Sequence, residues 1–166
     1  LYVDPKNGEV FVADGEGTGG NRRIAVLDGK GAFLRQWQPE SETVHCMDVA
    51  KDGLVYVCNR PGDRVQVYDR TGKFVRNIEI PWTPVTARSD GKTKASGGSA
   101  VALAFSSDAE QRLMFVINQN NSRIEVLERA TGKILSSFGS MGHYAGQFDQ
   151  PHGIAVDSKG NVYIAE

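Results

Sequence analysis

The sequence predicts an all-β protein, a β-propeller sector with three complete four-stranded blades and half of a fourth. First, a passage of short apolar strands recurs three times in full and a fourth time in part, with second strands at 9–14, 54–59, 113–118 and 161–166. Second, an arginine leads each third strand, at Arg23, Arg64 and Arg123. Third, four strands in a repeat of roughly 40–50 residues is typical of propeller blades.

The repeats place the blades along the chain. We expect blade one at 1–37, blade two at 45–80, blade three at 101–138 and half of blade four at 152–166. The segment 81–99, which contains Pro, Gly, Ser and Lys, is an insertion between blades two and three. Loops accept insertions at little cost, so a surface loop is our interpretation, with a binding loop as the alternative.

Local patterns justify the individual strands and turns. In the third strand of blade two, Val65 and Val67 alternate with more polar side chains, which buries one face of the strand. The second strand of blade three, at 113–117, is uniformly apolar, as expected where both faces contact other blades. Gly53 and Gly160 supply the positive-φ positions that tight hairpins need.

Composition limits the function classes. The chain has 166 residues, a net charge of −1 and a pI near 6.4, which argues against a dedicated nucleic-acid surface. No run approaches the ~18 apolar residues of a membrane span. Leu1 begins in what reads as mid-strand and Glu166 ends half a blade, so we interpret the chain as a fragment or one partner of an assembly. Open sheet edges then predict self-association, and the localisation stays open, with secreted or periplasmic as one option.

The stretch 138–166 resembles an NHL repeat. The resemblance rests on Gly146-Gln147-Phe148, on the run 151–157 and on the turn at 160–163, while 21–24 and 121–124 match the Asn-x-Arg-Ile turn of that repeat. It implies a propeller that is commonly six-bladed. Within that family the chain resembles bacterial propellers similar to the lyase of peptide α-amidation, which converts a peptidyl-α-hydroxyglycine to a peptide amide and glyoxylate.

Two histidines form the candidate metal site. His45 and His152 each precede the first strand of a blade, and each is followed eight residues later by a glycine. Blades two apart in a six-bladed ring are rotated by about 120°, so both side chains should converge on the channel mouth. Three imidazoles with an open fourth position are typical of catalytic zinc. The lyase resemblance implies zinc held by three histidines, the third upstream of residue 1; the alternative is that both histidines cap strands by hydrogen bonding.

The same resemblance implies two candidate catalytic residues. Arg60 matches an arginine that lines the lyase pocket and would bind a substrate carboxylate; the alternative is a solvated loop arginine. Glu16 stands where the lyase has its catalytic tyrosine, and a carboxylate there would act as a base rather than as a phenol. Gly153 replaces the lyase's calcium-binding acid. The recurring Arg23, Arg64 and Arg123 are interpreted as structural ion-pair or stacking residues.

Cys46 and Cys58 should lie nearly opposite each other on the first two strands of blade two, within reach of a disulfide. Bridges between directly paired strand cysteines are strained, so we predict two buried thiols.

Two functions follow from this sequence. One is a metal-dependent enzyme similar to the peptide-amidating lyase, with His45, His152, Arg60 and Glu16 around a peptide or small-molecule ligand at the channel mouth. The other is a non-catalytic platform that binds a protein or a small ligand through its loops.

Overall fold

The computed structural model describes residues 1–15, 19–41, 43–83 and 98–166, and these form antiparallel sheets, as predicted. Blade one contains β1 (Tyr2–Val3), β2 (Val10–Asp14), β3 (Arg23–Leu27) and β4 (Phe33–Trp37); blade two contains β5 (Val44–Val49), β6 (Val55–Asn59), β7 (Arg64–Tyr68) and β8 (Phe74–Glu79); blade three contains β9 (Ala100–Phe105), β10 (Leu113–Asn118), β11 (Arg123–Glu128) and β12 (Ile134–Phe138); the half blade contains β13 (Gly153–Val156) and β14 (Val162–Ala165). The propeller-sector fold is therefore confirmed.

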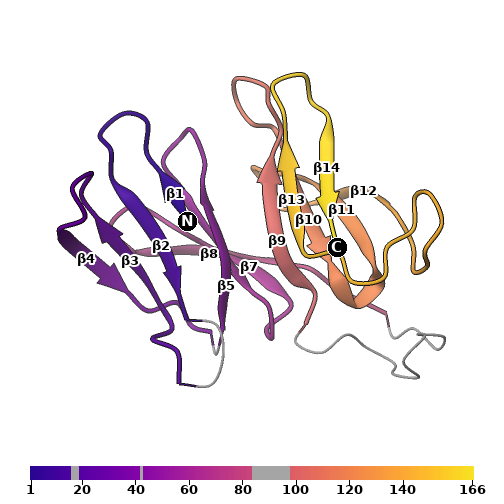
Figure 1. Ribbon diagram of the computed structural model, residues 1–166, viewed down its shortest axis with the longest axis horizontal. Helices are drawn as coiled ribbons and strands as arrows, with labels where there is room; N and C mark the ends of the chain where they lie inside the picture. Colours follow the sequence, from indigo (N-terminus) through magenta and orange to yellow (C-terminus); the bar gives the residue numbers. More distant parts are fainter. Residues whose placement is uncertain (16–18, 42, 84–97) are drawn as a thin grey trace.

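Each complete blade is a meander in which strands pair in sequence order, and the sheets stand side by side along an arc (Figure 1). The first strands β5, β9 and β13 lie next to one another near the middle of that view, and β9 contacts both of the others. The helical content of the described residues is one 3₁₀ turn, η1 (Gln119–Asn121). No helix in this part of the chain is long and apolar enough to span a bilayer.

The core lies between the blades rather than within them. One apolar cluster, which includes Phe11 and Val57, fills the space between blades one and two. A second, which includes Tyr56 and Phe105, fills the space between blades two and three. All residues of β6 are buried, because both faces of this strand pack against a neighbouring sheet. This packing fixes the first strands against one another and so positions the side chains at their ends.

One prediction about blade two is wrong. Cys46 and Cys58 are cross-strand partners in the register of β5 and β6, as expected, but they are joined by a disulfide rather than present as two thiols. Their Cα atoms are 4.9 Å apart, within the range that a disulfide spans. The bridge therefore joins the start of β5, where Cys46 follows His45, to the end of β6, where Cys58 lies two residues before Arg60.

Candidate functional site

The structure brings His45 and His152 together. Their ring centroids are 4.9 Å apart, and the ring planes cross at 62°. His45 is the second residue of β5, while His152 directly precedes β13, so the contact spans the width of blade three. The residues are 107 positions apart in number and are neighbours only because the first strands pack side by side.

A local irregularity directs His45 toward its partner. The pairing of β5 with β6 shifts register between Val44 and Cys46, which makes His45 the residue at a β-bulge. Bulges turn a side chain away from the regular alternation and are frequent next to functional sites. The His45 ring crosses to blade three, where its Nδ1 lies 2.7 Å from the carbonyl oxygen of Val101.

That hydrogen bond selects the tautomer of the neutral His45 ring. A carbonyl oxygen only accepts, so Nδ1 carries the hydrogen and Nε2 carries the lone pair. Histidines that bind metals commonly donate their other ring nitrogen to a carbonyl in this way. On the partner side, the backbone N–H of His152 donates to Ala165 at 2.8 Å, which anchors the start of β13 to β14 and leaves the His152 side chain exposed.

The spacing of the two rings fits shared coordination of one ion. Two imidazoles bound at about 2.0–2.1 Å in tetrahedral geometry have centroids about 5 Å apart. The observed separation is 4.9 Å. Among the described residues, no group of three or more His, Cys, Asp or Glu side chains gathers at one point. These parts of the chain therefore offer two candidate ligands, fewer than a zinc site requires.

Arg60 lies at the same end of the sheets and is held by a residue that the sequence reasoning missed. One Arg60 Nη2 hydrogen donates to Gln119 Oε1 at 2.6 Å. The Gln119 amide in turn donates to the carbonyl oxygen of Pro151 at 3.4 Å, one residue before His152. Gln119 is buried in η1, so a buried side chain of blade three links Arg60 to the residue that precedes His152.

A second missed residue organises the ends of the insertion. Asp63 Oδ1 accepts the backbone N–H of Ser99 at 2.7 Å and its hydroxyl at 2.9 Å, while Asp63 Oδ2 accepts the Trp82 indole N–H at 3.0 Å. Residues on both sides of the insertion, Trp82 and Ser99, are thus held by the same carboxylate, three positions after Arg60. The amide run 118–121 was a sequence signal for such a polar network, because so many buried amides need partners.

One more ionisable group lies in a pocket between blade two, blade three and the half blade. Asp48 lies three residues after His45 and lines a pocket of about 350 Å³ with Leu103, Phe105 and Ile154. Burial raises the pKa of its carboxyl, although the N–H of Val49 opposes that shift. The alternation of β5 gives no indication of this placement, because the other residues that line the pocket belong to blade three and the half blade. Glu16, the proposed base, lies outside the described residues.

Comparisons with known proteins agree with this fold. A family model described as a beta-propeller repeat, SBBP, matches residues 144–165. Over its whole length the chain is 27% identical to peptidyl-glycine alpha-amidating monooxygenase B of Xenopus laevis and 26% identical to monooxygenase A of the same species. It spans 19% and 17% of those two proteins.

Two solved structures share the fold at lower identity. Hydrazine synthase of Kuenenia stuttgartiensis superposes with a TM-score of 0.55 at 16% identity, over 84% of this chain and 34% of that one. The WD40 beta propeller domain of Doa1 superposes with a TM-score of 0.56 at 12% identity, over 85% of this chain and 39% of that one. The chain is a β-propeller sector, similar along its whole length to a part of the amidating monooxygenases.

Proposed function

We propose that this chain is part of a metal-dependent propeller enzyme that acts like the lyase of peptide amidation. The observation that carries the proposal is the convergence of His45 and His152 to 4.9 Å from two different blades. The similarity of the whole chain to part of two amidating monooxygenases supports the same direction. The proposed substrate class is a peptide that ends in α-hydroxyglycine.

In this proposal the two imidazoles hold the ion, with the His45 ring oriented by its hydrogen bond to Val101. A bound zinc ion would supply a positive centre that polarises a substrate oxygen. A third ligand comes from outside the described residues. The fit of the donors present is good, because neutral imidazole is a preferred zinc ligand and its spacing here suits one ion.

Arg60 has the role of substrate carboxylate recognition. Its guanidinium is fixed by Gln119, whose buried amide removes rotational freedom from the arginine before a ligand arrives. A planar guanidinium binds a carboxylate through two parallel hydrogen bonds. Glu16 remains the proposed base, in the place of the tyrosine of the lyase.

The test is metal affinity in the protein that carries residues 1–166. Bound zinc is measured by mass spectrometry, and cobalt(II) binding by its visible absorption. We expect His45→Ala and His152→Ala each to weaken metal binding at least tenfold. His143→Ala is the matched control, because His143 is exposed in a loop and should leave metal binding unchanged.

Activity is tested with the same variants. Glyoxylate release from a peptidyl-α-hydroxyglycine should fall with metal content in both histidine variants. Arg60→Lys should instead raise KM while metal binding is retained, because a lysine keeps the charge and loses the bidentate geometry. If the protein bound no metal, and if both histidine variants released glyoxylate as wild type does, the enzyme proposal would be overturned and the ligand-binding platform would remain.

A further inference from the structure

The arginines that lead the third strands offer a comparison within one molecule. Arg23, Arg64 and Arg123 each begin a third strand, and each is paired in register with the last residue of the second strand. Those partners are Asp14, Asn59 and Asn118. The backbone environment is therefore repeated, and differences between the three arginines come from the surrounding side chains.

Blades one and three neutralise their arginine with a carboxylate. In blade one, Arg23 Nε lies 2.8 Å from Asp14 Oδ2, on the opposite strand. In blade three, Arg123 Nε lies 2.7 Å from Glu125 Oε1, two residues along its own strand. The same Glu125 oxygen accepts the Asn118 amide at 2.8 Å. A carboxylate can therefore come from the last residue of the second strand, as in blade one, or from the third residue of the third strand, as in blade three.

Blade two has a neutral residue at each of those positions. Asn59 stands where blade one has Asp14, and Gln66 stands where blade three has Glu125. The Arg64 Nε atom is buried and has no hydrogen-bond partner within the described ranges. The Gln66 amide, fully buried, is likewise without one among those residues.

Nearby groups are already engaged. The Asn59 amide nitrogen donates to the carbonyl oxygen of Glu40 at 2.8 Å, and its oxygen accepts from Ser41 Oγ at 2.9 Å and from the N–H of Gly62 at 3.0 Å. An arginine with a buried, unpaired N–H is destabilising, because desolvation of a charged group is not repaid by a hydrogen bond. An external carboxylate at the guanidinium would supply the negative charge that the equivalent arginines find within their own blades.

The space for such an acceptor exists. Arg64 lines an open pocket of about 400 Å³ together with Glu40, Ser41, Asn59, Pro61 and Gly62. We propose that this pocket is a carboxylate-binding site in which Arg64 is the anion-binding residue. A ligand carboxylate would occupy the role that Asp14 and Glu125 have in the neighbouring blades.

The chemistry favours a carboxylate over a phosphate. The two groups that pair with the equivalent arginines are carboxylates, and a guanidinium matches a carboxylate in plane and spacing. Glu40 adds one negative charge to the pocket lining, which opposes a dianion more strongly than a monoanion. Neither His45 nor His152 lines this pocket, so acetate binding there is measured apart from metal binding.

The first test uses sodium acetate as the probe, with sodium chloride at equal ionic strength as the reference. The Nε–H signals of Arg23, Arg64 and Arg123 are followed by ¹⁵N NMR in the protein that carries residues 1–166. We expect the Arg64 signal alone to move and to saturate with acetate. Equal movement with chloride, or no movement at Arg64, would overturn the site.

The second test converts blade two to the arrangement of blade three. Gln66→Glu changes one amide to a carboxylate of the same shape, two residues from Arg64, as Glu125 is from Arg123. We expect at least tenfold weaker acetate binding and a higher melting temperature, since the internal carboxylate then pairs with Arg64. Arg64→Ala removes the proposed anion-binding residue but risks a failure to fold, so Gln66→Glu is the deciding variant. Unchanged acetate binding in Gln66→Glu would contradict the proposal.

The last test identifies the source of the carboxylate. A short neutral peptide with a free C-terminus is compared with its C-terminal amide and with an amidated peptide that contains one aspartate. Binding of the first or the third at least tenfold more tightly than the amide supports the site and assigns a terminal or side-chain carboxylate. Equal binding of all three overturns it.

Discussion

The two ends of the sheets differ in how far the repeat is maintained. At the turn end, formed by the connections at 4–9 and 50–54 and the outer turns at 69–73 and 128–133, neighbouring blades are joined by the same arginine arrangement twice. At the histidine end, formed by the loops at 38–41 and 60–63 and by η1, each blade has different polar partners. We interpret the repetition as a mark of structural contacts and the divergence as a mark of the places where the proposed ligands bind.

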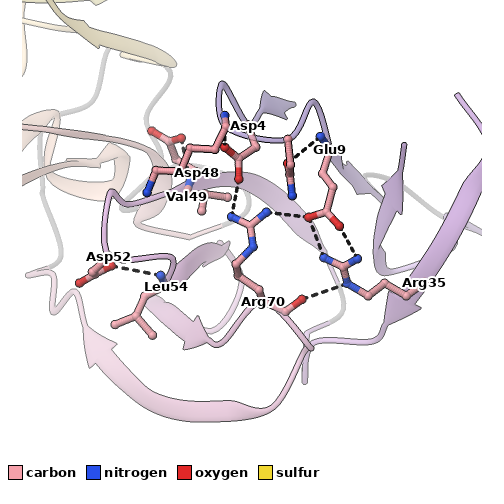
Figure 2. Close-up of polar contacts among 10 residues, drawn as sticks. Asp4, Glu9, Arg35, Asp48, Val49, Asp52, Leu54 and Arg70 are labelled. Carbon is pink, nitrogen blue, oxygen red and sulfur yellow. Dashed lines mark hydrogen bonds and ion pairs between the residues drawn. The ribbon is translucent and has the colours of Figure 1, made fainter. Parts of the chain in front are cut away.

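The junction of blades one and two shows the turn-end arrangement (Figure 2). Arg70 of blade two reaches into blade one, where its Nη1 lies 2.7 Å from Asp4 and its Nη2 lies 2.6 Å from Glu9. Arg35 also pairs with Glu9, at 2.8 Å, and its Nε donates to the carbonyl oxygen of Arg70 at 3.1 Å. Two cations and two anions therefore balance across the junction.

The junction of blades two and three repeats the device with fewer charges. Arg129 of blade three reaches back to Asp52 at 2.5 Å and to the Tyr56 hydroxyl at 3.2 Å. Arg76 donates to the carbonyl oxygen of Arg129 at 2.9 Å, as Arg35 does to that of Arg70. The comparison predicts that the two junctions respond to the same substitution by different amounts.

The largest expected effect is at Arg70. Asp4 is 4% exposed, so Arg70→Met leaves a buried carboxylate without its cation and should lower the free energy of unfolding by about 3–5 kcal/mol. The matched Arg129→Met should lower it by about 1–2 kcal/mol, because the side chain of Asp52 is 42% exposed and stays hydrated. Urea unfolding measures both. Equal losses would show that the apolar stems of the arginines, rather than their charges, hold the junctions.

The disulfide tests whether the histidine end depends on blade two in particular. Cys46→Ala with Cys58→Ala opens a bridge between residues 12 positions apart, which should lower the free energy of unfolding by about 2–3 kcal/mol. The same bridge lies next to the bulge that directs His45, so metal affinity should fall as well. Thermal unfolding and cobalt titration measure the two effects. A loss of stability with unchanged metal affinity would show that the disulfide does not maintain the bulge that positions His45.

The sequence predicted what depends on strand period and turn register. The strands and the register of Cys46 opposite Cys58 follow from alternation and glycine spacing, and so does the placement of His45 and His152 at the same point of their blades. Contacts between blades were missed, because the period of a strand does not state which side chain of the next sheet it meets. Gln119 and Asp63 are examples. The recurring arginines are interpreted as ion-pair or stacking residues, and the ion pairs are confirmed for Arg23 and Arg123. Within the described ranges Arg64 Nε has no hydrogen-bond partner, because Asn59 and Gln66 stand at the two positions that hold carboxylates in the other blades.

The smallest expected effect is the pH dependence of the turn end. Hydrogen bonding from Arg35 lowers the pKa of Glu9 from 4.5 to about 2, against the opposing effect of burial. A carboxyl whose pKa is lower in the folded state stabilises that state above its ordinary pKa, and the contribution disappears as the pH falls from about 4.5 toward 2. Glu9→Gln should therefore lower the free energy of unfolding by about 1.5 kcal/mol at pH 7, because the hydrogen bonds from Arg35 and Arg70 lose their charged acceptor. The difference between wild type and Glu9→Gln should shrink through that acidic window, as followed by urea unfolding at several pH values.

Asp48 provides the contrast, because burial raises the pKa of its carboxyl. The stability of Asp48→Asn relative to wild type should therefore increase as the pH rises, whereas the effect of Glu9→Gln changes as the pH falls. If both variants changed in the same direction with pH, the ion pairs of the turn end would not be the source of its stability.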